Sequence, residues 1–427
     1  MRITSRPISL LDIAKLALYG IFLNYYCYYI LRGQFIKNGT QIFFVVAVGC
    51  TVASLFREKF YVGAEIKCWI VYLALSLATV PFALDSSVAL DGLDKYWQRL
   101  AIIAIIAYIC EQEKSVRFAI RLLAVTAIAC AVSCLIMNTG ISSKLEMESG
   151  ASVSTNDIGS IMAFGCFAVL FAFGLKEHRG LIKTIIKIGY IIAAVSVIFL
   201  AGSRKSILAV LILFALLFLL CGKDLFKNMS STRFILVTLL IIGAVVFVYF
   251  YLLPNVENTD MYQRVWGRKA EGAAESDLGR IGLYERALIY FFEKPLFGLG
   301  FNGFSSLTGS YTHSVYVEPL ACSGTLGLLY LAPYVMILVK QIKLIKENQV
   351  LSEERLWQKE LLAFYISFLF VGLGIPYIYK DIPCIILAMF IASQKISFDK
   401  IKEAETRAAS ESSNHEQITD QSITGLT

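Results

Sequence analysis

The sequence predicts an all-α integral membrane protein with about twelve transmembrane helices. Of its 427 residues, 57% are hydrophobic and only 17% are charged, and the mean hydropathy is +0.67. Soluble domains carry about a quarter charged residues, so this much apolar sequence cannot be buried in one soluble core. The ten cysteines lie in apolar segments without a CxxC pair. That distribution favours small packing residues over a disulfide framework or a metal site.

The predicted spans are apolar runs, and a run of about 20 residues crosses a bilayer as a helix. They lie near residues 11–31, 40–56, 67–84, 98–111, 117–138, 156–175, 183–201, 205–221, 233–253, 315–339, 360–378 and 381–396. Segments on one side of this arrangement, such as KEHRGLIK and KQIKLIKEN, hold more Lys and Arg than those on the other. The positive-inside rule therefore predicts a multi-pass protein of the cytoplasmic (inner) membrane with both termini cytoplasmic.

This topology divides the chain into two parts. Residues 1–396 form a polytopic membrane domain, and residues 397–427 are polar and predict a disordered cytoplasmic tail. Between the ninth and tenth spans, residues 254–313 form a long loop on the outer face. Because loops of that length are usually functional, this one directs attention to the outer face. The formal charge of +7 fits loops facing anionic lipid better than it fits nucleic-acid binding.

The stretch GSRKS at 202–206 predicts a tight outward-facing hairpin between two spans. Ser203 can cap the following helix, whose N-terminus presents unpaired N–H groups and a partial positive charge. With Arg204 and Lys205 on top, this helix start is suited to bind a diphosphate. The alternative is that both cations simply snorkel to the membrane interface.

In the long loop, GRIGLYERALIYFFE predicts an amphipathic helix that lies in the outer interface. At helical spacing, one face carries Arg280, Tyr284, Ala287, Leu288 and Phe291. Arg280 on that face could reach a lipid phosphate, or the face could simply rest on lipid. The following GLGFNG matches a dinucleotide-binding pattern but lacks the strand before it, so we expect a turn whose glycines let backbones approach closely.

The last candidate is THSVYVEPL, where the tenth span re-enters the membrane. His313 stands at that boundary and can act as a general base at neutral pH. Ser314 follows it, and Glu318 lies a little further into the span as a rival base, since an ionisable residue inside a span is a functional candidate. A histidine at a loop end can also be incidental.

Taken together, and in the order in which they follow one another along the chain, these motifs resemble the superfamily of O-antigen ligases and Wzy-type polysaccharide polymerases. The resemblance is strongest over residues 200–335, and STNDIGSIMAFG at 154–165 resembles an Asn-containing span start upstream. It implies a metal-independent, inverting glycosyltransferase of the GT-C type without a cofactor. Arg204 and Arg280 match the family's arginines, and His313 matches the histidine proposed to activate the acceptor hydroxyl. The family usually has His-Asn, whereas this chain has His313-Ser314, which puts any role of the neighbouring residue in question.

The resemblance also implies partners: donor and acceptor glycans on undecaprenyl diphosphate, the lipid bilayer, and a chain-length regulator and a flippase. It leads to a polymerase that joins lipid-linked repeat units for O-antigen, capsule or exopolysaccharide. A ligase that transfers the glycan to lipid A core or protein shares the chemistry and remains open. A non-enzymatic transporter or flippase is a third alternative, for which repeats, broken spans and buried charges would be the signature.

Overall fold

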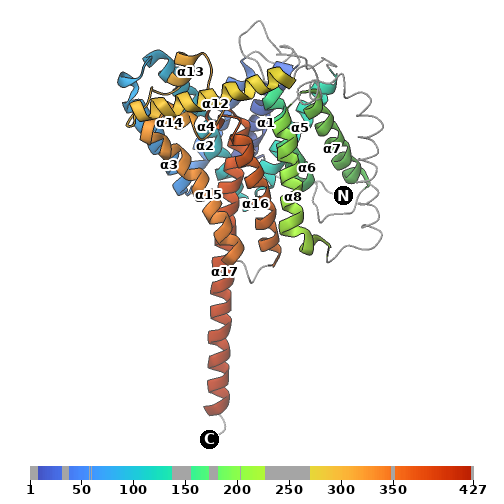
Figure 1. The fold of residues 1–427 in the computed structure, drawn as a ribbon. Helices are drawn as coiled ribbons and strands as arrows, with labels where there is room; N and C mark the ends of the chain where they lie inside the picture. Colours follow the sequence, from blue (N-terminus) through green and yellow to red (C-terminus); the bar gives the residue numbers. More distant parts are fainter. Residues whose placement is uncertain are drawn as a thin grey trace.

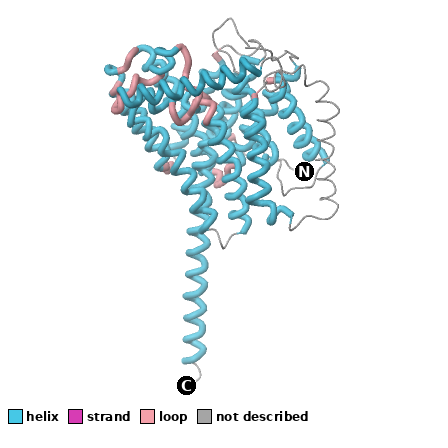
Figure 2. The backbone as a smooth tube through the Cα atoms, in the orientation of Figure 1, coloured by secondary structure: helices cyan, strands magenta, loops and turns pink. Residues whose placement is uncertain are grey.

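The computed structural model describes residues 8–30, 38–56, 58, 60–136, 155–172, 181–201, 203–226, 270–347 and 352–424. Within these ranges the chain is helical and has no strand, as Figure 2 shows, so the predicted helical class is confirmed. The long helices are α1 (Leu10–Ile30), α2 (Gly39–Leu55), α3 (Ala64–Ala78), α4 (Ser86–Gln112), α5 (Arg117–Ile136), α6 (Thr155–Ala172), α7 (Leu181–Leu200), α8 (Arg204–Phe226), α12 (Ala270–Glu293), α15 (Gly327–Glu347), α16 (Ser352–Gly372) and α17 (Ile382–Thr424). Short α13 (Gly303–Thr308), α14 (Glu318–Ser323), η1 (Val80–Phe82), η3 (Gly324–Leu326) and η4 (Tyr377–Tyr379) connect them.

A helix lies at each predicted span except the ninth, 233–253, which falls outside the described residues. By length and apolar composition, four described segments can cross a membrane: Arg117–Leu135, Arg204–Gly222, Glu318–Glu347 and Ile382–Arg407. Gly39–Leu55 and Asn156–Ala172 are apolar but shorter. These apolar helices fit an integral membrane protein, while the total of twelve spans stays a prediction.

The helices form a bundle with α12 lying across one end of it (Figure 1). Along the bundle α1 packs on α2, α8 on α16, α4 on α17, α5 on α6 and α3 on α15. Figure 2 shows that most of the described loops gather near α12. We call this region the α12 end; it comprises α12 to α14 and the loops 294–302, 309–317 and 373–381. Its α12 and the loop after it occupy most of the described part of the predicted long loop, and residues 254–269 lie outside the described ranges.

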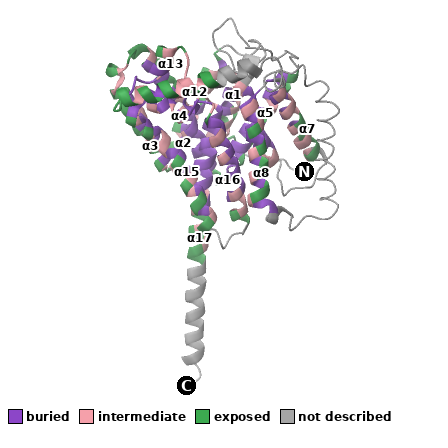
Figure 3. Cartoon of the chain, in the orientation of Figure 1, coloured by how far each residue is buried: buried purple, intermediate pink, exposed green. Residues whose placement is uncertain are grey.

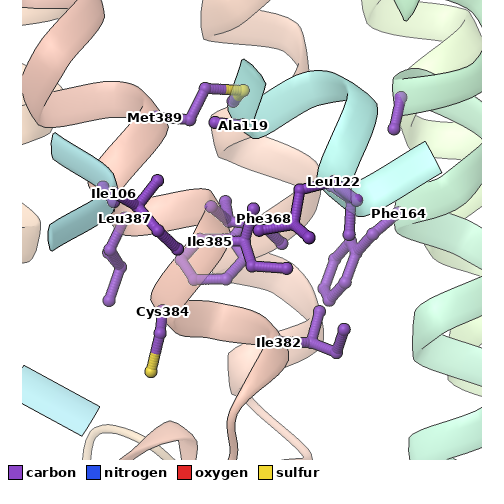
Figure 4. Close-up of a cluster of buried hydrophobic side chains, with 14 of the residues drawn as sticks. Ile106, Ala119, Leu122, Phe164, Phe368, Ile382, Cys384, Ile385, Leu387 and Met389 are labelled. Carbon is purple, nitrogen blue, oxygen red and sulfur yellow. The ribbon is translucent and has the colours of Figure 1, made fainter. Parts of the chain in front are cut away.

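The core of the bundle is apolar and aromatic, and the first half of α17 runs through it (Figure 3). In the close-up of Figure 4, Ile385 of α17 lies beside Phe368 of α16, and Met389 of α17 lies beside Ala119 of α5. Phe167 and Phe364 stack with ring centroids 4.0 Å apart and join α6 to α16. Inside a bilayer such packing is stabilised by van der Waals contacts between the helices rather than by removal of apolar surface from water, and it fixes the helices that carry the loops at the α12 end.

The fourth helix begins earlier than the predicted span 98–111. Asp85 precedes it in an extended conformation, and its Oδ1 accepts hydrogen bonds from the backbone N–H groups of Ser87 at 2.9 Å and Val88 at 3.2 Å. This N-cap sets the start of α4 at Ser86. Hydropathy placed the boundary too late because the first turns carry Asp91, Asp94 and Lys95.

The disordered tail at residues 397–427 stays a prediction, although the backbone of α17 continues as one helix to Thr424 in the structure. Its early part, FDKIKEAETRAA, is rich in strong helix formers. Lys395 pairs with Asp399 one turn later at 2.7 Å, and Lys400 pairs with Glu354 of α16 at 2.9 Å.

The GLGFNG stretch is a turn that passes close to two other segments, as expected from its glycines. Gly298 and Gly300 have positive φ values of 64° and 91°, and a Cβ on Gly300 would lie 2.3 Å from the Cβ of Ala83. Between them, the N–H of Leu299 donates to the carbonyl of Ala321 at 3.1 Å. The carbonyl of Leu299 accepts from the N–H of Leu84 at 2.9 Å. The turn thus ties the start of α4 to α14.

We predict that Gly300→Ala lowers the melting temperature of the detergent-purified protein. The left-handed backbone conformation is unfavourable for alanine, and its Cβ would clash with Ala83; each effect costs about 1 kcal/mol or more. Gly282→Ala is the matched control, since Gly282 is helical and a Cβ there would meet nothing within 4 Å. The control should be neutral or stabilising by up to about 1 kcal/mol. Equal melting temperatures for the two variants would contradict this account of the turn.

Candidate functional site

The start of α8 lies against α6 at the α12 end. Ser203 immediately precedes the helix, is buried, and shares a hydrogen bond of 2.7 Å between its Oγ and that of Ser206. Gly159 of α6 faces this pair so closely that a Cβ on it would lie 2.6 Å from the Cβ of Ser203. The close approach brings Asp157, in the first turn of α6, to the start of α8.

Lys205 is the residue of the predicted GSRKS site that points into the α12 end. Its Nζ donates a hydrogen bond of 2.6 Å to the carbonyl of Gly374, in the loop between α16 and α17. Its charge is among the largest influences on the pKa of His313. The side chains of Arg204 and Lys205 are half-buried at the first turn of α8. The structure therefore brings Lys205 into electrostatic contact with His313, and the role predicted for Arg204 stays a prediction.

Arg280 reaches the same place from α12. It is half-buried, and one turn further Tyr284 donates its hydroxyl to the carbonyl of Leu373 at 2.7 Å. Ala287 on this face is fully buried, while Leu288 is 42% exposed, so the packed face is narrower than the sequence predicts. Arg286 lies six residues after Arg280, about 240° around the helix, and is exposed.

His313 lies in a strained turn between these cations. Its φ is 61°, in the left-handed region that few non-glycine residues adopt. The Tyr311 ring contacts the imidazole with centroids 4.4 Å apart. Burial, together with the positive charges of Arg280, Lys205 and Lys380, lowers the pKa of His313 to about 4. The imidazole is therefore neutral at physiological pH and can accept a proton or a hydrogen bond.

Glu318 holds this turn and is poorly placed to act as a base. It is fully buried at the start of α14, and its Oε2 accepts a hydrogen bond of 2.6 Å from the N–H of Thr312. Its Oε1 accepts from the hydroxyl of Tyr379 at 3.0 Å and from the thiol of Cys322 at 3.6 Å. With both oxygens occupied, the carboxylate fixes the residue preceding His313.

Ser314 also contributes to the turn. Its Oγ accepts a hydrogen bond of 3.2 Å from the N–H of Tyr316, and its own N–H donates to Oγ1 of Thr312 at 3.3 Å. Next to it, the N–H of Val315 donates to the carbonyl of Gly372 at 2.9 Å. The buried Ser314 side chain thus stabilises the local backbone in this structure.

The sequence analysis missed Lys380, Asp157 and Tyr311. The Nζ of Lys380 lies 2.7 Å from Oδ2 of Asp157 and 5.9 Å from the centroid of the Tyr311 ring. The charges of Lys380 and Asp157 shift the pKa of His313, and the Tyr311 ring lies beside its imidazole. The signal was present as the short polar stretch YKD between the last two spans and as the acid in STND at the start of another span. Hydropathy gave both segments little weight because they are short.

The arrangement is therefore a cluster of cations around a neutral imidazole, at the N-terminal end of a helix. Within the described ranges, no group of three or more His, Cys, Asp or Glu side chains is placed to hold a metal ion. Cations and a helix N-terminus together attract anions such as phosphate groups. A neutral imidazole next to such an anion can take a proton from a hydroxyl group.

Two comparisons with known proteins bear on this site. The family model described as O-antigen ligase matches residues 188–332, which include Lys205, Arg280, His313 and Glu318. Asp157 and Lys380 lie outside the matched segment. No curated protein matches the chain. The apolar helices and the family match together indicate an integral membrane protein whose residues 188–332 are similar to the O-antigen ligase family.

We predict that Glu318→Gln lowers the melting temperature, because one amide cannot accept all the hydrogen bonds that the carboxylate accepts. An unpaired buried partner costs about 1–3 kcal/mol. Glu285→Gln, at an exposed position of α12, is the matched control and should leave the melting temperature unchanged. A Glu318→Gln protein with unchanged stability but no activity would instead identify the carboxylate as a chemical participant.

Proposed function

We propose that the chain, whose residues 188–332 place it with the O-antigen ligase and Wzy-type polymerase superfamily, is a glycosyltransferase that polymerises lipid-linked oligosaccharides. Its donor and acceptor are repeat units on undecaprenyl diphosphate. The observation that carries the proposal is the convergence of Lys205, Arg280 and His313, from three separate segments, at one end of the bundle. Cations there can hold a diphosphate while the imidazole faces the reacting sugar.

In this proposal, the diphosphate of the donor lies against Arg280 and the start of α8. The acceptor hydroxyl oxygen attacks the anomeric carbon and gives its proton to the imidazole of His313. As the new glycosidic bond forms, the bond between the anomeric carbon and the phosphate oxygen breaks, and its electron pair stays on the diphosphate. Cations already in place stabilise that developing charge without reorganisation, which is the largest contribution in many enzymes. Attack opposite the leaving group inverts the anomeric configuration.

The low pKa of His313 fits a base that works only beside a bound donor. A base with a pKa near 4 accepts protons weakly at neutral pH. The donor diphosphate carries negative charge, which opposes the effect of Arg280 and Lys205 and raises the pKa of the imidazole. The proton acceptor is therefore strengthened when the donor is present.

The α12 end is proposed to face outward from the cytoplasmic membrane, with both termini in the cytoplasm. The basis is the distribution of Lys and Arg in the sequence. Lipid-linked repeat units are then available from a flippase, and a chain-length regulator is an expected partner. A ligase that uses lipid A core or a protein as acceptor is the second candidate, because the matching family model is described as O-antigen ligase.

The proposal predicts that the purified protein, reconstituted in vesicles with one lipid-linked repeat unit alone, forms a ladder of polymers. Gel separation of labelled glycan measures the ladder. His313→Ala should reduce turnover by about 10²–10⁴-fold, the usual contribution of a general base. Arg280→Ala should abolish the ladder, whereas Arg286→Ala, an exposed arginine of the same helix, should not. Product that appears only after lipid A core is added would establish the ligase instead.

The shifted pKa of His313 predicts that kcat and kcat/KM fall at different acidic pH values. A base must be unprotonated, so activity falls as the pH drops through its pKa. For kcat/KM, which reports the free enzyme, the fall should come near pH 4, well below an ordinary histidine. For kcat, which reports the donor complex, it should come at higher pH. A limb near pH 6.5 for both constants would contradict this electrostatic account.

A further inference from the structure

The loop between α16 and α17, residues 373–381, connects more of the site than any motif in the sequence indicated. Its backbone carbonyls accept hydrogen bonds from Tyr284 of α12 and Lys205 of α8. Asp381 pairs with Arg99 of α4 at 2.8 Å, and Tyr379 donates to Glu318. These contacts fix the position from which Lys380 extends its side chain toward α6. The loop lies outside the segment that matches the family model.

The pair that Lys380 forms with Asp157 is neither a surface ion pair nor a fully buried one. The two side chains are 24% and 15% exposed, and their charged atoms lie 2.7 Å apart. The Lys380 ammonium also lies 5.9 Å from the Tyr311 ring centroid, and that ring contacts His313. Lys380 is thus one side chain away from the imidazole. Its positive charge lowers the pKa of His313, and the negative charge of Asp157 raises it.

We propose that Lys380 is a third cation of the donor site and that Asp157 serves as its counter-ion in the ligand-free protein. When a diphosphate binds, the ammonium turns from the carboxylate of Asp157 to a phosphate oxygen. This inference rests on the function proposed above and adds two residues to its donor site.

The position of Asp157 makes such an exchange physically reasonable. The carboxylate stands in the first turn of α6, where the helix dipole and free N–H groups stabilise a negative charge without help from a cation. Asp157 can therefore release Lys380 at low cost. Lysine suits the exchange because its compact ammonium sits on a flexible four-carbon stem and needs no fixed bidentate geometry.

A purely structural role for the pair leads to a different expectation. If the pair only ties the loop 373–381 to α6, removing either charge loosens the site and weakens anion binding. If Asp157 competes with the ligand for Lys380, removing the two charges has opposite effects. The signs of the two changes therefore decide between the roles.

The test is calorimetric titration of the full-length, detergent-purified protein with inorganic pyrophosphate. Lys380→Ala should weaken binding by about tenfold or more, the contribution of a charge-assisted hydrogen bond. Asp157→Asn should tighten binding by up to about fivefold, since a partly exposed competing ion pair is worth about 1 kcal/mol or less. In the double variant the gain from Asp157→Asn should vanish. Weaker binding in both single variants would overturn the proposal.

Lys395→Ala and Asp399→Asn are matched controls, because this pair has the same 2.7 Å separation but lies further along α17, away from the α12 end. Neither should change the affinity.

Arg280→Ala separates the role of Lys380 from the existence of the donor site itself. If Arg280→Ala weakens binding and Lys380→Ala does not, only the role of Lys380 fails. If the wild-type protein does not bind pyrophosphate, both the inference and the proposed donor site fail.

A second arm distinguishes a lipid-linked donor from a phospholipid headgroup as the source of the phosphate. The titration is repeated in nanodiscs of phosphatidylcholine with and without phosphatidylglycerol. We expect the same pyrophosphate affinity in both, because a headgroup with one phosphate should not displace a diphosphate. Loss of binding in the discs with phosphatidylglycerol would assign the site to that lipid and overturn the donor assignment.

Discussion

The hydrogen bonds accepted by Glu318 are the constraint on which the rest of the site depends. This buried carboxylate joins the residue before His313 to the hydroxyl of Tyr379, so it connects the turn 311–314 to the loop 373–381. Both segments are irregular backbone, and a left-handed histidine is not stable on its own preference. Because its surroundings hold it there, the strain identifies a position that the fold maintains for a purpose.

Around this constraint, three separate segments supply positive charge to the site. Lys205, Arg280 and Lys380 come from α8, α12 and the α16–α17 loop, and each acts on His313. Like charges repel, so bringing them together costs free energy unless an anion joins them. The Lys380–Asp157 pair offsets part of that repulsion in the free protein. A bound diphosphate would offset more of it, which links donor binding to the chemistry of the imidazole.

Sequence reasoning predicted the parts of this account that are local. Apolar runs located the helices, the GSRKS hairpin located the start of α8, and the amphipathic pattern located α12. It assigned the diphosphate to Arg204 and gave Lys205 only a supporting role, because the hydrogen bond from Lys205 to Gly374 depends on the direction in which α8 faces the loop 373–381. It missed Lys380 and Asp157 because they are far apart in the chain and meet only through the packing of α6 against α8. For the tail, polar composition alone does not separate a disordered segment from a helix such as the end of α17.

The central claim is that an anionic donor lies between the start of α8 and Arg280, beside His313. Its most direct test is a cryo-electron microscopy map of the protein in nanodiscs with a non-reacting analogue of the lipid-linked donor. The account predicts diphosphate density in contact with Lys205 and Arg280, with the first sugar next to the imidazole of His313. Diphosphate density away from both the start of α8 and Arg280 would contradict it.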